Sequence, residues 1–174
     1  MSSVSQTPLR RPLGFAFRMA VAAVAAVAAV VVGMAPAARY LPHAPDLALY
    51  AGLPLTIQLH IAAAVGALAL GAVLMLVRKG RLFHRAAGWV WVSLAGLVVG
   101  TSIFITELNN GAWSLVHLFT GWTLIVLPSA VMWAKRHDVA RHRRTMMGLF
   151  YGGFAINMFI AFIPGRTMWN MFFG

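Results

Sequence analysis

The chain has 174 residues, of which 61% are hydrophobic and 10% are charged, and its formal net charge is +11 at pH 7. Soluble domains carry roughly 25% charged residues, so this composition excludes an ordinary soluble domain. The chain contains no cysteine, which excludes disulfides, thiolate catalysis and cysteine-ligated clusters. The basic residues form short groups between long apolar runs, which indicates a membrane protein rather than a nucleic-acid-binding one.

Five stretches without Asp, Glu, Lys or Arg are long enough to cross a membrane, which takes roughly 20 helical residues. We expect spans near residues 19–38, 54–77, 86–106, 113–134 and 145–164. Asn109-Asn110-Gly111 predicts a tight turn between the third and fourth spans. The predicted fold is therefore all-α, an integral membrane helical bundle of five transmembrane helices. It forms a single domain over residues 19–174, after a cytoplasmic N-terminal arm at residues 1–18.

Lys and Arg residues concentrate on one side of these predicted spans. Twelve of the fourteen lie in the N-terminal arm and in the loops after the second and fourth spans, whereas Arg39 and Arg166 lie opposite. The positive-inside rule then puts the N-terminus inside and the C-terminus outside, in a bacterial inner membrane. The first span has an alternative interpretation. Arg10 and Arg11, an Ala/Val core and Ala35-Pro36-Ala37 also resemble a cleavable signal peptide, whose loss leaves the other orientations unchanged.

The second and third spans resemble the fourth and fifth, which predicts a four-helix core of two tandem hairpins. Each hairpin has a histidine near its outer end, at His60 and His117, and a His-Arg pair after its basic loop, at His84-Arg85 and His142-Arg143. Parallel repeats of this kind place equivalent residues at equal depth. We therefore expect His60 to face His117 near the outer surface and His84 to face His142 near the cytoplasmic surface. Roughly 25 Å of helix separates the two levels.

Two opposed histidine pairs suit bis-histidine haem, because axial imidazoles hold the iron and set its redox potential. A porphyrin also needs space between the helices, and the residue one turn deeper than the histidine is small in three cases, Ala64, Gly88 and Gly121, but not at Met146. Haem propionates need cations. The candidates are Arg85, Arg143 and Arg144 on the inner side, with Arg39 or Arg166 on the outer side.

Each of these features also has a purely structural explanation. An intramembrane histidine can bond to a neighbouring carbonyl, small residues are common where helices pack closely, and the positive-inside rule accounts for the arginines. The sequence contains no Ser-His-Asp arrangement, phosphate-binding loop or zinc motif. A hydrolase or a nucleotide-driven enzyme therefore has no residues to support it.

The order of the four histidines on four consecutive spans resembles that of the transmembrane di-haem b cytochromes of the ascorbate and ferric reductase type. In that family the first histidine pairs with the third and the second with the fourth. The resemblance implies the pairs His60 with His117 and His84 with His142, up to two haem b groups and a transmembrane oxidoreductase. The chain departs from the family in having short loops and no recognisable ascorbate-binding motif, which puts the electron donor in doubt.

His60 and the segments His84-Arg85-Ala86-Ala87-Gly88 and His142-Arg143-Arg144-Thr145-Met146 are similar to a second family. It comprises bacterial predicted membrane proteins classed as a domain of unknown function. This resemblance implies a compact multi-helix membrane protein and no particular activity.

Transmembrane electron transfer by a b-type di-haem protein is the leading functional hypothesis, with quinol or another small reductant as electron donor. The alternative is a non-enzymatic membrane scaffold, a subunit of a larger complex or a lipid-binding protein, whose His-Arg pairs contact anionic head groups. Both hypotheses have the lipid bilayer as a partner and exclude nucleic acid. The electron acceptor stays open, as does assembly into a homo-oligomer or a complex.

Overall fold

The protein is helical throughout the residues that its computed structural model describes, which are 41–106 and 116–174. In chain order the elements are α2 (Leu47–Gly52), α3 (Leu55–Leu76), α4 (Leu82–Ser102), α5 (Val116–Lys135), α6 (Val139–Gly148), the π-helix η2 (Leu149–Ala155), α7 (Ile156–Ala161) and α8 (Thr167–Phe173). Of these, α3, α4 and α5 are each long and apolar enough to cross a membrane. The all-α fold and the membrane class predicted from the sequence are thus confirmed. The predicted N-terminal arm, first span and Asn109-Asn110-Gly111 turn lie outside the described residues.

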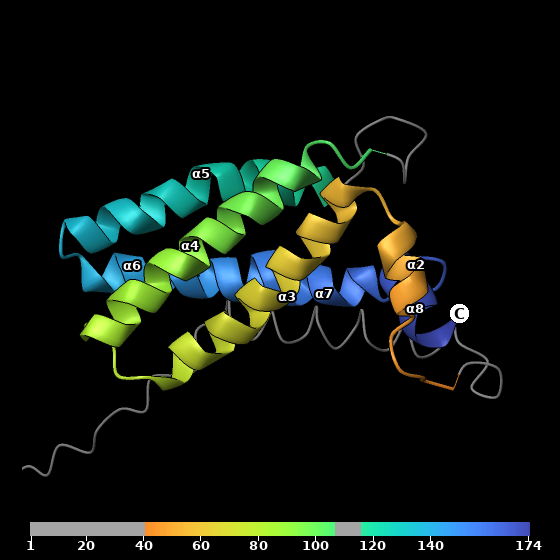
Figure 1. Ribbon diagram of the computed structural model, residues 1–174. Coiled ribbons are helices and arrows are strands. Elements are labelled where there is room, and N and C mark those ends of the chain that lie inside the picture. The colour runs from red at the N-terminus through yellow and green to blue at the C-terminus, as the bar shows by residue number, and fades with distance from the viewer. Residues whose placement is uncertain (1–40, 107–115) are drawn as a thin grey trace, which may run out of the picture.

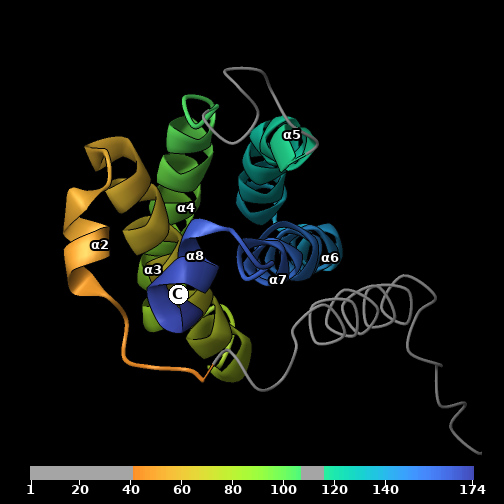
Figure 2. The same ribbon diagram turned by 90° about the vertical axis from the view of Figure 1, so that its right-hand side faces the viewer.

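Two antiparallel hairpins lie side by side, α3 with α4, and α5 with the rod formed by α6, η2 and α7 (Figure 1). Contacts of α4 with α5 and of α3 with η2 join the hairpins. Seen from the end, α3 and α5 therefore occupy one diagonal, and α4 and the α6–η2–α7 rod occupy the other (Figure 2). This is the arrangement expected for two tandem hairpins. The basic loops lie at one end of the bundle, and α2 and α8 lie at the other.

The predicted fifth span is helical but not uniformly α-helical. α6, η2 and α7 follow one another without a break from Val139 to Ala161, and η2 is a π-helical segment. Segments of this kind are rare and occur frequently at functional sites. A Cβ on Gly153 would lie 3.4 Å from the Trp122 ring, an ordinary van der Waals contact, so the α5 indole packs against this part of the π-helix.

Two helices begin earlier than the charge-free stretches predicted. α4 begins at Leu82 rather than near residue 86, and α6 begins at Val139 rather than near residue 145. The prediction stopped at basic residues, yet the arginines continue the helices with exposed side chains: Arg85, Arg141, Arg143 and Arg144. Long arginine side chains keep their charge in water while the backbone stays helical. His84 and His142 consequently lie within helices and not in loops.

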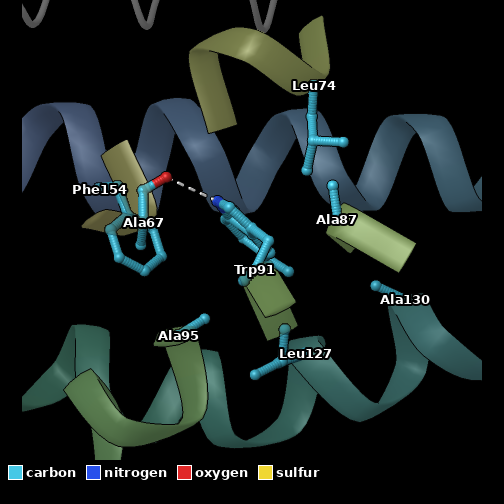
Figure 3. Close-up of a cluster of buried hydrophobic side chains, with 9 residues drawn as sticks. Ala67, Leu74, Ala87, Trp91, Ala95, Leu127, Ala130 and Phe154 are labelled. Atoms are coloured by element: carbon cyan, nitrogen blue, oxygen red, sulfur yellow. Dashed lines mark hydrogen bonds between the residues drawn. The ribbon is translucent and has the colours of Figure 1, made fainter. Parts of the chain in front are cut away.

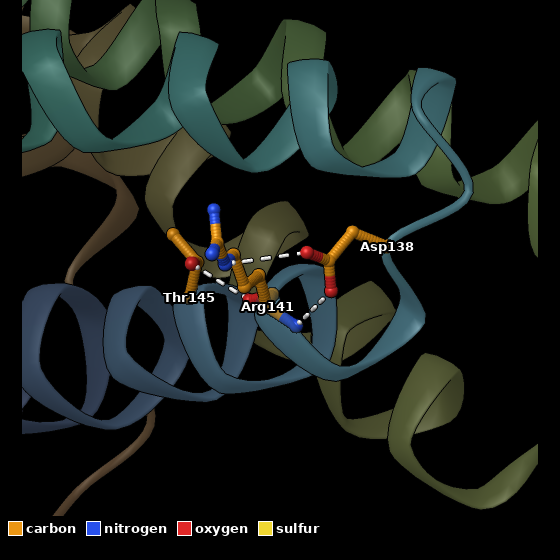
Figure 4. Close-up of polar contacts among 3 residues, drawn as sticks. All are labelled: Asp138, Arg141 and Thr145. Atoms are coloured by element: carbon orange, nitrogen blue, oxygen red, sulfur yellow. Dashed lines mark hydrogen bonds and ion pairs between the residues drawn. The ribbon is translucent and has the colours of Figure 1, made fainter.

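The turn between α5 and α6 is built from local hydrogen bonds. His137 adopts a left-handed conformation with φ of 58°, and the Asp138 amide donates to the Trp133 carbonyl over 3.0 Å, as in the Schellman ending of a helix. The Asp138 carboxylate then accepts from the Arg141 amide and pairs with the Arg141 guanidinium, 3.0 and 3.2 Å away (Figure 4). The same short segment therefore ends α5 and caps α6.

Trp91 lies at the centre of the core, with 1% of its surface exposed. Its indole Nε1–H donates to the Ala67 carbonyl over 2.8 Å, and its ring lies 5.4 Å from the Phe154 ring (Figure 3). The buried neighbours are small or aliphatic: Leu74, Ala87, Ala95, Leu127, Ala130 and Leu149. Lipid tails are as apolar as these side chains, so close packing and interhelical hydrogen bonds hold such a bundle together.

Gly71 provides a direct test of this packing. A Cβ at Gly71 would lie 2.5 Å from the Phe150 ring and 2.8 Å from Trp91 Nε1, whereas a Cβ at Gly96 would meet nothing within 4 Å. Gly71→Ala should destabilise the protein by about 1–3 kcal/mol through overpacking. The control Gly96→Ala should leave stability unchanged or raise it, because Ala favours helix over Gly by roughly 1 kcal/mol. Thermal unfolding in detergent measures both changes, and equal midpoints for the two variants would contradict this account of the core.

Candidate functional site

A cavity of about 350 Å³ lies among α3, α4, α5 and α7, near the end of the bundle that carries α2 and α8. Ligand pockets span roughly 300–1,000 Å³, so this one is near the lower end of that range. Most of its lining is apolar, including Ile57, Ile61, Leu68, Val98, Phe119, Phe154 and Ile160. Both outer histidines of the sequence prediction, His60 and His117, line the same cavity, as does Ala64.

The His60 ring has a defined orientation. Its Nδ1 lies 3.1 Å from the Val98 carbonyl and 3.0 Å from the Thr101 hydroxyl oxygen. A carbonyl can only accept, so Nδ1 carries the proton, and the Thr101 hydroxyl donates in turn to the Leu97 carbonyl over 2.7 Å. A neutral imidazole with its proton on Nδ1 leaves Nε2 as an acceptor or a metal ligand. Metal-binding histidines commonly have this arrangement, with the other ring nitrogen donating to a carbonyl.

His117 approaches the cavity from the opposite direction. It lies in the first turn of α5, whereas His60 lies on α3, and these two helices are diagonal in the bundle. Both imidazoles line one cavity, and they come from helices that are diagonal in the bundle. A group bound in the cavity could therefore be held from two sides. The predicted pairing of His60 with His117 is in this respect compatible with the fold.

Further polar groups line the same cavity. The Ser102 and Thr120 hydroxyls hydrogen-bond to each other over 2.8 Å and satisfy one another across α4 and α5. Asn157 donates through Nδ2 to the Gly153 carbonyl over 2.6 Å, but its Oδ1 is buried and accepts no hydrogen bond from the described residues. Arg166 completes the set at the turn before α8. The cavity therefore combines an apolar body with several fixed polar groups.

The inner histidines lie at the other level of the bundle. His142 Nδ1 is 2.9 Å from the Ala130 carbonyl and so donates to it. His84 lies close enough to His142 for their charges to interact, and its Nδ1 is buried without a hydrogen bond from the described residues. The two residues belong to the second diagonal pair, α4 and α6. The core residues Leu74, Ala87, Leu127 and Leu149 belong to α3, α4, α5 and η2 of the same bundle.

The two histidine levels are distinct sites. Val98, whose carbonyl accepts from His60, follows His84 by fourteen residues on α4, which is about 21 Å at 1.5 Å per residue. Among the described residues, no three His, Cys, Asp or Glu side chains gather into a group that could hold a metal. The arrangement is one of separated pairs.

The remaining predicted site residues do not line the cavity. Arg85, Arg143 and Arg144 have exposed side chains at the basic end. Gly88 and Gly121 also lie outside the cavity lining, and a Cβ on either would meet nothing within 4 Å. Their missing side chains therefore do not create the cavity. Arg39 lies outside the described residues.

Sequence reasoning missed Thr101 and Asn157 and gave no reason to prefer Arg166 over Arg39. Thr101 orients His60 from a neighbouring helix, and such a contact leaves no trace in a hydropathy pattern. Asn157 did carry a signal, since an amide inside an apolar span is costly and usually functional or paired. Comparison with protein-family models, with curated proteins and with solved structures finds no match to the chain. The two resemblances noted in the sequence therefore remain predictions.

The carbonyl contacts make a spectroscopic prediction. In protein with ¹⁵N-labelled histidine, at a pH at which the rings are neutral, His60 and His142 should both carry the proton on Nδ1, because each Nδ1 faces a backbone carbonyl. Exposed His137, whose ring bonds to no carbonyl among the described residues, provides a reference that can exchange between tautomers in water. A spectrum with the proton on Nε2 of His60 would contradict the orientation described here.

Proposed function

We propose that the protein is a b-type haem protein of the bacterial inner membrane that carries electrons across the bilayer, and that His60 and His117 would hold its outer haem. The observation that supports this most directly is that both imidazoles line one apolar cavity from diagonal helices. When bound, haem supplies one-electron redox chemistry. Two imidazoles on one iron leave it no open position for oxygen, which favours electron transfer over oxygen chemistry.

The residues around the outer pair fit this group. His60 Nδ1–H donates to the Val98 carbonyl, which holds the ring and leaves Nε2 for a metal. The Ile, Leu, Val and Phe side chains of the lining would surround a flat apolar group. A low-dielectric surrounding of this kind also tunes the potential of a bound redox centre.

His84 and His142 would hold a second haem at the cytoplasmic end, with His142 oriented by the Ala130 carbonyl. Exposed Arg85, Arg143 and Arg144 stand beside this pair and would bind propionates there. Electrons would enter from a reductant such as quinol near the inner pair and leave at the outer pair.

The second candidate function is that of a membrane scaffold or lipid-binding protein with structural histidines. It is favoured by the carbonyl contacts of His60 and His142, which satisfy these rings without any bound group. The basic end also combines cations with an aromatic ring, since the Arg141 guanidinium lies 4.6 Å from the centre of the Trp133 ring. Anionic head groups would then bind the exposed arginines at this end.

An absorption spectrum distinguishes the two functions. Protein purified from haem-replete cells should show the Soret and reduced α-bands of low-spin haem, and His60→Ala or His117→Ala should remove the outer haem. If a second haem is present, the band from the inner pair should survive both changes. The matched control is His137→Ala, which replaces an exposed loop histidine and should leave the spectrum intact. Colourless wild-type protein would refute the haem proposal.

The scaffold function predicts that the same variants change no haem band. His60→Ala and His117→Ala would then only lower the free energy of unfolding. The expected loss is about 1–3 kcal/mol, because each change removes a contact or leaves a buried polar group without its partner. Binding to vesicles of anionic lipid would fall after Arg85 and Arg143 are both replaced by Gln. Haem bands that disappear with His60 would exclude this alternative.

We further propose five spans, with the basic loops in the cytoplasm and the C-terminus outside. Because the chain contains no cysteine, single introduced cysteines report the topology directly. Ala44→Cys should react with a membrane-impermeant maleimide in spheroplasts, whereas Arg78→Cys and Arg136→Cys should react only after lysis. Labelling in the reverse order would overturn the orientation, and labelling of all three in spheroplasts would show leakage and require sealed vesicles of known orientation.

A further inference from the structure

Arg166 is a cation placed at an apolar cavity. It lies between α7 and α8, beside Gly165, whose φ of 85° permits the tight turn, and it lines the cavity together with Thr167 and Met168. Its side chain is only partly exposed. Within the described part of the chain, the ion pair formed is that of Asp138 with Arg141 at the opposite end, and no carboxylate pairs with Arg166. A partly desolvated cation of this kind favours an anionic partner.

Asn157 adds a second polar group that the protein leaves unsatisfied. Its Nδ2 is held by the Gly153 carbonyl of the π-helix, so the orientation of the amide is fixed. Its Oδ1 is buried, and the described residues offer it no donor. Buried acceptors are nearly always hydrogen-bonded in native proteins. The cavity that Asn157 and Arg166 share is thus suited to a ligand with an apolar body and polar groups on its rim.

We infer that Arg166 anchors the acid group of the molecule that fills the outer cavity, while His60 and His117 lie against its apolar body. The chemical class is a carboxylate attached to a large apolar group. A porphyrin propionate belongs to this class, and the inference then rests on the proposed haem function. A fatty acid belongs to it as well, so the experiment includes both.

The test uses the full chain, purified without haem in detergent, and metal-free protoporphyrin, which bears carboxylates but cannot be ligated by histidine. Its dimethyl ester is the neutral counterpart, and both are titrated by quenching of tryptophan fluorescence. Wild-type protein should prefer the acid to the ester. Arg166→Gln should weaken binding of the acid roughly tenfold or more, the scale of a charge-assisted hydrogen bond, and should leave the ester unchanged. Arg78→Gln is the matched control, because it removes an exposed cation at the opposite end.

The outcomes separate this inference from the proposed function. If Arg166→Gln weakens the binding of the acid and of the ester equally, or weakens neither, Arg166 is not an acid anchor. That result does not contradict haem binding through the histidines. If only a fluorescent fatty acid binds, and its binding depends on Arg166, the anchor is supported with a fatty acid as its ligand, and the absorption spectrum decides the haem proposal. If neither porphyrin nor fatty acid binds, the acid anchor is overturned, and the absorption spectrum of the wild-type protein decides the haem proposal separately. Thermal unfolding of Arg166→Gln and of Arg166→Lys, which should retain part of the preference, verifies that the variants are folded.

Discussion

The hydrogen bond from the Trp91 indole to the Ala67 carbonyl sets the register on which the site depends. His60 precedes Ala67 by seven residues on α3, and Val98 follows Trp91 by seven residues on the antiparallel α4. The same register that joins Trp91 to Ala67 therefore brings the His60 ring to the Val98 carbonyl, two turns away. Inside a bilayer, a tryptophan N–H without a partner is costly, so a slip of these helices would break both contacts together.

The two ends of the bundle differ although the hairpins are arranged alike. The core of leucine, alanine and Trp91 joins the helices along the bundle, whereas a cavity lined by the outer histidines lies towards the end that carries α2 and α8. The π-helical segment occurs only in the α6–η2–α7 rod among the described elements. It shifts the rod by part of a turn relative to an α-helix, with Phe154 in the core and Asn157 at the cavity. The asymmetry of the bundle thus coincides with a local change of helix type.

Polar groups in an apolar cavity lower the stability of the protein unless they are paired or bind a ligand. The Ser102 and Thr120 hydroxyls satisfy each other, and the His60 Nδ1 is satisfied by backbone and hydroxyl groups. Asn157 Oδ1 and Arg166 differ, because their partners are absent from the described residues. Intramembrane polar residues usually mark a binding or transport site, and here the two unsatisfied groups lie on the same cavity as the histidine pair.

The sequence alone determined the class of the protein, because long apolar stretches can satisfy their backbone in a bilayer only as helices. It also indicated the hairpin pairing, since His60 and His117, and His84 and His142, recur at matching positions. Helix starts were placed too late at Leu82 and Val139, because a charge count cannot show how far an arginine side chain reaches to water. Only the tertiary structure decided that the outer pair borders a cavity and that Asn157 and Arg166 join it. Those contacts depend on the register of Trp91 against Ala67 and on the π-helix, which arise from side-chain packing between distant segments rather than from local hydrophobicity.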